Sequence, residues 1–121
     1  MAPFRLTFEL VKGGKYGFIY KNGDDLRQDQ LILGMFALMD KTLKGVNQDY
    51  RLTPYQALAC TKSDGYVEFV PHTKTFQSIV LKDYLAQLIK KKSETVMENY
   101  IFSIAGYCAI TYFFMIGDRH L

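Results

Sequence analysis

Cysteine is scarce in this chain, and the two that occur, Cys60 and Cys108, lie far apart in unlike surroundings. Such a pair does not provide the disulfide framework of a small secreted domain, so a reducing compartment is expected. The opening residues, MAPFRLTFEL, alternate apolar and polar instead of forming the apolar block of a secretory leader. We therefore expect a cytoplasmic protein.

A large excess of either charge is also lacking, because 15 Lys and Arg stand against 12 Asp and Glu. The net charge of +3 gives no reason to expect nucleic acid as a partner. The one run of like charge, Lys90 to Lys92, is explained better as a solvated helix end than as a binding patch. An apolar fraction of 49% and an aromatic fraction of 15% indicate one folded globular domain.

Charged residues are absent from 99–117, so a membrane-spanning helix has to be considered. Against it stand Ser103, Gly106, Thr111 and three tyrosines within the segment, with no basic residue directly following. A buried helix of a helical lobe explains this composition better.

The N-terminal half reads as strands around one helix. Residues 4–10 alternate strictly and predict a strand, which a turn at Gly13 and Gly14 joins to a second strand over 16–21. Residues 50–61 are expected to be extended, although Pro54 excludes a central position in a sheet there. A short strand over 66–70 is stopped by Pro71.

Helical periodicity begins after Asn22-Gly23 and returns after Pro71. The first helix is expected to end at Gly45. Two further helices are predicted over 76–92 and 93–117, the second with Ser93 or Thr95 as its cap. The apolar stripe of the first helix consists of Ile32, Met35, Phe36, Met39 and Leu43. These elements predict an α+β fold.

The segment KNGDDLRQDQ places Lys21 at the end of a strand and a cluster of acids, Asp24, Asp25 and Asp29, at the start of a helix. Kinases hold a nucleotide with a strand lysine and a carboxylate on the adjoining helix, because phosphoryl transfer depends on positioning and charge neutralisation. The alternative is an ordinary helix cap beside a surface lysine. GDRHL, residues 117–121, follows a predicted buried helix and is equally compatible with a catalytic loop or a solvated helix end.

Together, YKNGDDLRQDQLIL, RLTPYQAL, AGYCAITY and GDRHL resemble the catalytic domain of the phosphatidylinositol 3- and 4-kinases. The glutamine after GDDLRQD and the leucine after DRH are most similar to the class III phosphatidylinositol 3-kinases. The resemblance covers nearly the whole chain and is weakest over 72–92. It implies a kinase-like bilobal fold, with a small β-sheet lobe and hinge over 1–70 and the start of a helical lobe over 71–121.

By this resemblance the ATP site includes Lys21 as the phosphate-binding lysine, with Asp24 and Asp29 as the acids near it. Tyr55 is expected in the nucleotide pocket beside Asp29. The segment YVEFV resembles the hinge, where the backbones of Glu68 and Val70 pair with adenine and Phe69 lies between them. The Glu68 side chain is given no role.

GDRH resembles the catalytic loop of the same family. His120 then acts on the proton of the inositol 3-hydroxyl and on transition-state charge, with Asp118 in support, and imidazole is a reasonable base at neutral pH. Arg119 is expected to brace the loop.

Two features of the family are absent from these 121 residues. The family's phosphate-binding loop precedes the first strand, and its Mg²⁺ or Mn²⁺ ligands lie in an Asp-Asn pair and an Asp-Phe-Gly segment that follow DRHL, beyond Leu121. We therefore expect a fragment that has no kinase activity by itself.

The resemblance also implies partners and a location. ATP and phosphatidylinositol are the expected substrates, on the surface of endosomal and autophagic membranes, with a regulatory protein-kinase-like subunit and a coiled-coil scaffold. Two alternatives stay open: a non-catalytic module that binds nucleotide or partners, and a protein-directed kinase of the same superfamily.

Overall fold

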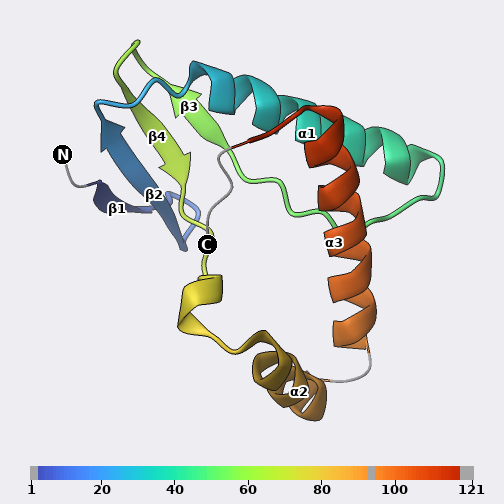
Figure 1. Cartoon of the computed structure of the whole chain (residues 1–121). Helices are drawn as coiled ribbons and strands as arrows, with labels where there is room; N and C mark the ends of the chain where they lie inside the picture. The colour runs from blue at the N-terminus through green and yellow to red at the C-terminus, as the bar shows by residue number, and fades with distance from the viewer. Residues whose placement is uncertain (1–2, 93–94, 118–121) are drawn as a thin grey trace. The chain divides into compact units, whose positions relative to one another are not determined.

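The computed structural model of the chain describes residues 3–92 and 95–117 (Figure 1). The chain divides into two compact units. The first comprises the described residues up to Met39 and Pro54–His72, and the second comprises Asp40–Thr53 and the described residues from Thr73 onward. The division into lobes at residue 70 remains a prediction.

The first unit contains four strands: β1 (Phe4–Glu9), β2 (Lys15–Asn22), β3 (Ala57–Ala59) and β4 (Asp64–Glu68). They form one antiparallel sheet in the order β1-β2-β4-β3, as Figure 1 shows. The strands predicted over 4–10 and 16–21 are confirmed, and Gly13 and Gly14 both have positive φ angles in the turn between them. The α+β fold class predicted from the sequence is confirmed.

The last strand is displaced from its predicted position, because β4 begins at Asp64 and ends at Glu68. The N–H groups of Cys60 and Thr61 both donate to the Asp64 carbonyl, at 3.1 and 3.2 Å. This tight turn starts β4 at Asp64, two residues before the strand predicted over 66–70.

Period-two alternation gives the sheet two unlike faces. One face is aromatic, and its rings contact one another across three strands, with Phe8 against Phe18, Phe18 against Tyr66, and Tyr66 against Tyr20. The other face carries Lys21. The register pairs Lys21 with Gly65 on that face.

The helix after β2, α1 (Arg27–Gly45), is held to the sheet by its first turns. Leu26 is buried beside Gly65, and the Gln30 side chain accepts a hydrogen bond from the Ala59 N–H of β3 at 2.8 Å. Phe36 is buried as predicted, whereas Met35 is 40% exposed, so the predicted stripe is only partly covered.

Gly45 was predicted to end α1, but the helix includes it and Asn47 takes the left-handed conformation, with a φ of 61°. The Gln48 N–H donates to the Leu43 carbonyl and the Asn47 N–H to the Lys44 carbonyl, which is the hydrogen-bond pattern of a Schellman cap. Asparagine tolerates this conformation better than most residues, so it replaces glycine here.

The second unit contains α2 (Leu81–Lys92) and α3 (Thr95–Phe113). The helix predicted over 76–92 begins only at Leu81, after a separate 3₁₀ turn at Phe76–Ser78. Ile79 is extended, with φ −137° and ψ 150°, and separates the two. β-Branched residues at 79 and 80 favour that extended conformation.

The helix predicted over 93–117 spans Thr95–Phe113 in the structure. Met115, with a φ of 51°, ends it through hydrogen bonds from Met115 N–H to Tyr112 and from Ile116 N–H to Thr111. Ser93 lies outside the described residues, and the cap at Thr95 remains a prediction. No helix in the part of the chain that the structure describes has the length and apolarity needed to cross a membrane.

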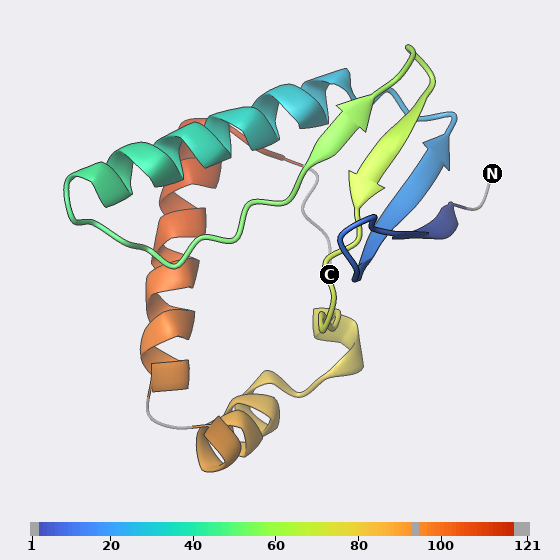
Figure 2. The same cartoon turned by 180° about the vertical axis from the view of Figure 1, so that it is seen from behind.

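Within the second unit, residues 46–53 run alongside α3, in both Figure 1 and Figure 2. Leu52 and Ile110 are buried, and the Thr53 N–H donates to the Tyr107 hydroxyl at 3.2 Å. Gly106 makes this approach possible, because a Cβ there would lie 2.8 Å from the Cβ of Tyr50.

We expect Gly106→Ala to destabilise the fold by about 1–3 kcal/mol, because a backbone-linked atom of Tyr50 would have to move. Gly34→Ala is the matched control, since a Cβ at Gly34 meets nothing within 4 Å. It should stabilise α1 by about 0.5–1 kcal/mol. Urea unfolding of both variants measures the difference, and equal stability of the two would contradict close packing of Gly106 against Tyr50.

Candidate nucleotide-binding site

Lys21 lies on β2 with its side chain 38% exposed, on the face of the sheet opposite the aromatic rings. Its Nζ atom is 3.2 Å from Oδ2 of Asp24. Across the sheet stands Gly65, where a Cβ would lie 2.4 Å from the Leu58 carbonyl oxygen, so that position cannot carry a side chain without a shift of the backbone. The ammonium group is thus paired with an acid, beside a glycine that Leu26 covers.

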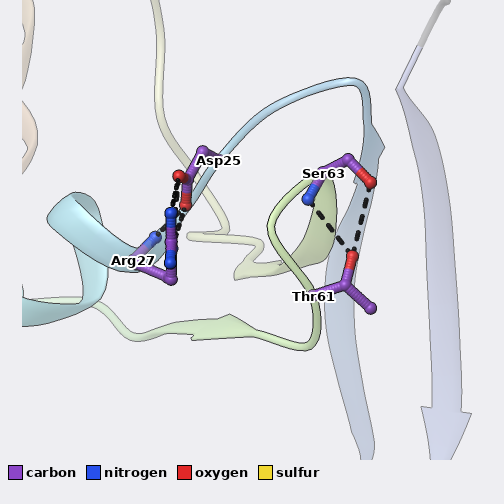
Figure 3. A network of polar contacts seen from close by, with 4 residues as sticks. All are labelled: Asp25, Arg27, Thr61 and Ser63. Carbon is purple, nitrogen blue, oxygen red and sulfur yellow. Dashed lines mark hydrogen bonds and ion pairs between the residues drawn. The ribbon is translucent and has the colours of Figure 1, made fainter.

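A glycine turn brings Asp24 back to Lys21. Gly23 has a φ of 95°, and its N–H donates to the Ser63 carbonyl at 2.7 Å. Figure 3 shows the turn that presents Ser63, where the Thr61 hydroxyl accepts the Ser63 N–H at 3.2 Å. The hydrogen bond to Ser63 therefore sets the direction in which the chain leaves β2. This direction brings Asp24 within reach of Lys21.

The second acid pairs with a different cation. Arg27, the first residue of α1, donates two side-chain hydrogen bonds to Asp25 (Figure 3). Its Nε lies 2.8 Å from Oδ1 and its Nη2 lies 2.6 Å from Oδ2. The Arg27 N–H also donates to Asp25 Oδ1, at 3.1 Å. These hydrogen bonds lower the pKa of Asp25 to about 2 and raise the pKa of Arg27. Asp25 thus accepts the first main-chain N–H of α1 as well as the Arg27 side chain.

Asp29 lies in the first turn of α1 and is exposed. It forms none of the ion pairs found within residues 3–92 and 95–117, so the structure pairs Lys21 with Asp24 and not with Asp29. The role of Asp29 near a bound nucleotide remains a prediction.

The segment predicted as a hinge, residues 66–70, includes the end of β4 and continues its pairing with β2. The Phe69 N–H donates to the Gly17 carbonyl at 2.9 Å, and a Cβ on Gly17 would lie 3.1 Å from the Phe69 Cβ. Arg5 from β1 stacks over the Phe69 ring, with its Cζ 3.8 Å from the ring centre. The bare Gly17 gives room for this stack on the face that carries Lys21.

Glu68 forms two hydrogen bonds with Gln56, the residue just before β3. Its N–H donates to the Gln56 carbonyl at 2.8 Å, and its carboxylate accepts the Gln56 N–H at 3.0 Å. A hydrogen bond to the same carboxylate raises the pKa of Tyr16. The Glu68 side chain, which sequence reasoning left without a role, therefore organises this end of the sheet. Tyr55, 41% exposed, precedes Gln56, and Val70 is half-buried beyond β4.

Three residues that sequence reasoning did not select also lie on the Lys21 face: Arg5, Ile19 and Val67, which the register places opposite one another. Ile19 could have been found, because period-two alternation puts it beside Lys21 on β2. The stack of Arg5 on Phe69 leaves no such signal, since it depends on strand order. A groove of about 520 Å³ between α1 and Ala59 borders this face, but its lining does not include Lys21, Ile19 or Val67.

The predicted catalytic residues Asp118, Arg119 and His120 lie outside the described residues. Within residues 3–92 and 95–117, no group of three or more His, Cys, Asp or Glu side chains is placed to hold a metal ion. Cys60 and Cys108 are both free.

A small antiparallel sheet of four strands, followed by helices, is the arrangement expected of a fragment of a kinase-like fold. Residues 15–95 match the family model described as phosphatidylinositol 3- and 4-kinase, and the chain belongs to that family.

Similar proteins carry more specific names. The chain is 43% identical to phosphatidylinositol 3-kinase pik3 of Schizosaccharomyces pombe, 41% identical to the nodule isoform of phosphatidylinositol 3-kinase of Glycine max, and 39% identical to phosphatidylinositol 3-kinase VPS34 of Saccharomyces cerevisiae. All of this chain is covered in each comparison, but only 17%, 16% and 15% of the respective relatives. The chain thus spans about a sixth of their length.

The Asp25–Arg27 pair predicts a specific acid titration. Because the pKa of Asp25 is depressed in the folded state, its stabilising effect is present above the ordinary value of 3.8 and is lost as pH falls through about 2. Carbon NMR of the Asp25 carboxyl should give a midpoint near 2, which moves toward 3.8 in Arg27→Gln. Arg51→Gln, which removes the separate pair with Asp49, should leave the Asp25 midpoint in place. An Asp25 midpoint that ignores Arg27 would contradict the assignment.

Proposed function

We propose that this chain is part of an ATP-dependent lipid kinase that phosphorylates phosphatidylinositol at the 3-position. The observation that carries the proposal is the Lys21–Asp24 pair on the glycine-lined face of β2 and β4, in a chain of the phosphatidylinositol 3- and 4-kinase family. The names of the relatives, all phosphatidylinositol 3-kinases, support position 3.

The first unit supplies the nucleotide-binding residues. Lys21 binds the phosphates, and Asp24 keeps its ammonium group oriented in the absence of nucleotide. Ile19 and Val67, side by side on the same face, offer an apolar surface to adenine, while the backbones of Glu68 and Val70 pair with its edge. Phe69, held by Arg5, bounds this surface, and Asp29 and Tyr55 complete the pocket.

The chemical step is assigned by family resemblance. His120 receives the proton of the inositol 3-hydroxyl, Asp118 supports it, and Arg119 braces the loop. Mg²⁺ or Mn²⁺ bound with ATP supplies charge neutralisation on the phosphates, through ligands that the family carries after its DRHL motif.

The cellular setting follows from the same relatives. We propose peripheral action on endosomal and autophagic membranes, together with a regulatory protein-kinase-like subunit and a coiled-coil scaffold. The similarity to phosphatidylinositol 3-kinase VPS34 supports this setting.

Nucleotide binding tests the first part of the proposal. We expect the chain to bind ATP in isothermal titration calorimetry, and Lys21→Met to weaken binding about tenfold or more through loss of a charge-assisted contact to phosphate. Lys15→Met is the matched control, because Lys15 lies on the same strand and face but at its far end, 71% exposed. Equal losses in the two variants would overturn the assignment of Lys21.

Phosphate transfer tests the second part. With phosphatidylinositol vesicles, Mg²⁺ and labelled ATP, residues 1–121 alone are expected to bind nucleotide and to transfer no phosphate, because the family's metal-binding segments are not among them. Labelled lipid formed by the unsubstituted chain and lost in His120→Ala would show that these segments are dispensable, contrary to this prediction.

A further inference from the structure

The rung between Gln56 and Glu68 is formed in an unusual way. A hydrogen-bonded pair in an antiparallel ladder exchanges two main-chain bonds, each residue donating one and accepting one. Here the Glu68 N–H donates to the Gln56 carbonyl at 2.8 Å, which is the first of the two. The Gln56 N–H, however, donates to Oε2 of the Glu68 side chain at 3.0 Å. A carboxylate oxygen has thus taken the place of the Glu68 carbonyl.

This exchange leaves the Glu68 main-chain carbonyl without its ladder donor. On the side of β2, the next rung joins Phe69 to Gly17, so the alternation of the ladder directs the Glu68 carbonyl toward β3 and the edge of the sheet. Gln56 is the residue that would satisfy it there, and its N–H is already engaged. Among the described residues, no other main-chain N–H is hydrogen-bonded to this carbonyl outside the strand ladders. A carbonyl at the edge of the sheet with no main-chain donor is available to a donor from a ligand.

The carboxylate is held in place from the aromatic face. Glu68 pairs in register with Phe18, and the hydrogen bond from the Tyr16 hydroxyl reaches the same carboxylate. Tyr16 itself packs on Phe18, with ring centres 4.7 Å apart. The Glu68 side chain therefore lies on the face opposite Lys21 and does not have to touch a nucleotide to influence its binding.

We propose that the Glu68 carboxylate is a positioning residue: by capturing the Gln56 N–H it keeps the Glu68 main-chain carbonyl open to accept a hydrogen bond from the exocyclic amino group of a purine nucleotide. The inference rests on the proposed function for its ligand. It assigns a source of base selectivity, because a 6-amino purine donates at that position whereas a 6-oxo purine presents an acceptor and is repelled.

The ladder itself can be measured without any ligand. Scalar coupling across a hydrogen bond between the Gln56 amide nitrogen and the Glu68 carbonyl carbon should be absent in the unsubstituted chain and should appear in Glu68→Ala, where the rung closes normally. Glu68→Gln retains a side-chain oxygen at the same distance from the main chain. In this variant the Gln56 N–H should still bond to the side chain, and the coupling should again be absent. A coupling already present in the unsubstituted chain would overturn the inference.

Nucleotide selectivity measures the consequence. We expect Glu68→Ala to bind ATP about three- to tenfold more weakly, the loss of one hydrogen bond, while its affinity for inosine triphosphate stays within about twofold. Glu68→Gln should keep the preference for ATP over inosine triphosphate. Unchanged preference in a folded Glu68→Ala would sink the proposal.

Failure of the proposed nucleotide-binding function can be distinguished from failure of the inference about Glu68. If the unsubstituted chain binds neither nucleotide, the proposed function fails and with it the purine ligand, while the coupling between Gln56 and Glu68 still decides whether the carboxylate opens the rung. Amide spectra of each variant establish folding first. Glu68→Gln, which preserves side-chain size and the acceptor for Gln56, serves as the folded reference if Glu68→Ala unfolds.

Discussion

The pairing of β2 with β4 is the constraint on which the candidate site depends. Its register sets Lys21 opposite Gly65 and Ile19 opposite Val67, so a cation, a buried glycine and an apolar surface share one face. The same ladder extends to Gly23 and Ser63 at one end and to Gly17 and Phe69 at the other. A shift of one residue would move Lys21 to the aromatic face and separate it from this surface.

Much of this arrangement could be predicted from the sequence, because it follows from local patterns. Period-two alternation located β1, the Gly13-Gly14 turn located β2, and the Asn22-Gly23 pair indicated the turn that returns Asp24 to Lys21. The helix ends could not be predicted in the same way. Asn47 adopts a left-handed conformation where Gly45 was the expected terminator, and Met115 does so before the predicted end of the last helix at residue 117.

Some contacts of the candidate site could likewise be predicted from local sequence patterns, and others could not. Asp24 and Asp29 are both acids near Lys21 in sequence, and only three-dimensional geometry shows that the ion pair goes to Asp24. The stack of Arg5 on Phe69 and the bond from Gln56 to the Glu68 carboxylate join residues distant in the chain. No spacing rule within one strand reveals such contacts, since they arise from the order β1-β2-β4-β3.

The hydrogen bond from Ala59 to Gln30 has a consequence for the behaviour of the chain in solution. β3 is an outermost strand, and outward-facing amides on such strands recruit foreign strands and promote aggregation. Gln30 occupies one of the few such amides on a strand of three residues. By occupying this amide, Gln30 leaves β3 with one fewer unpaired donor for intermolecular β-pairing.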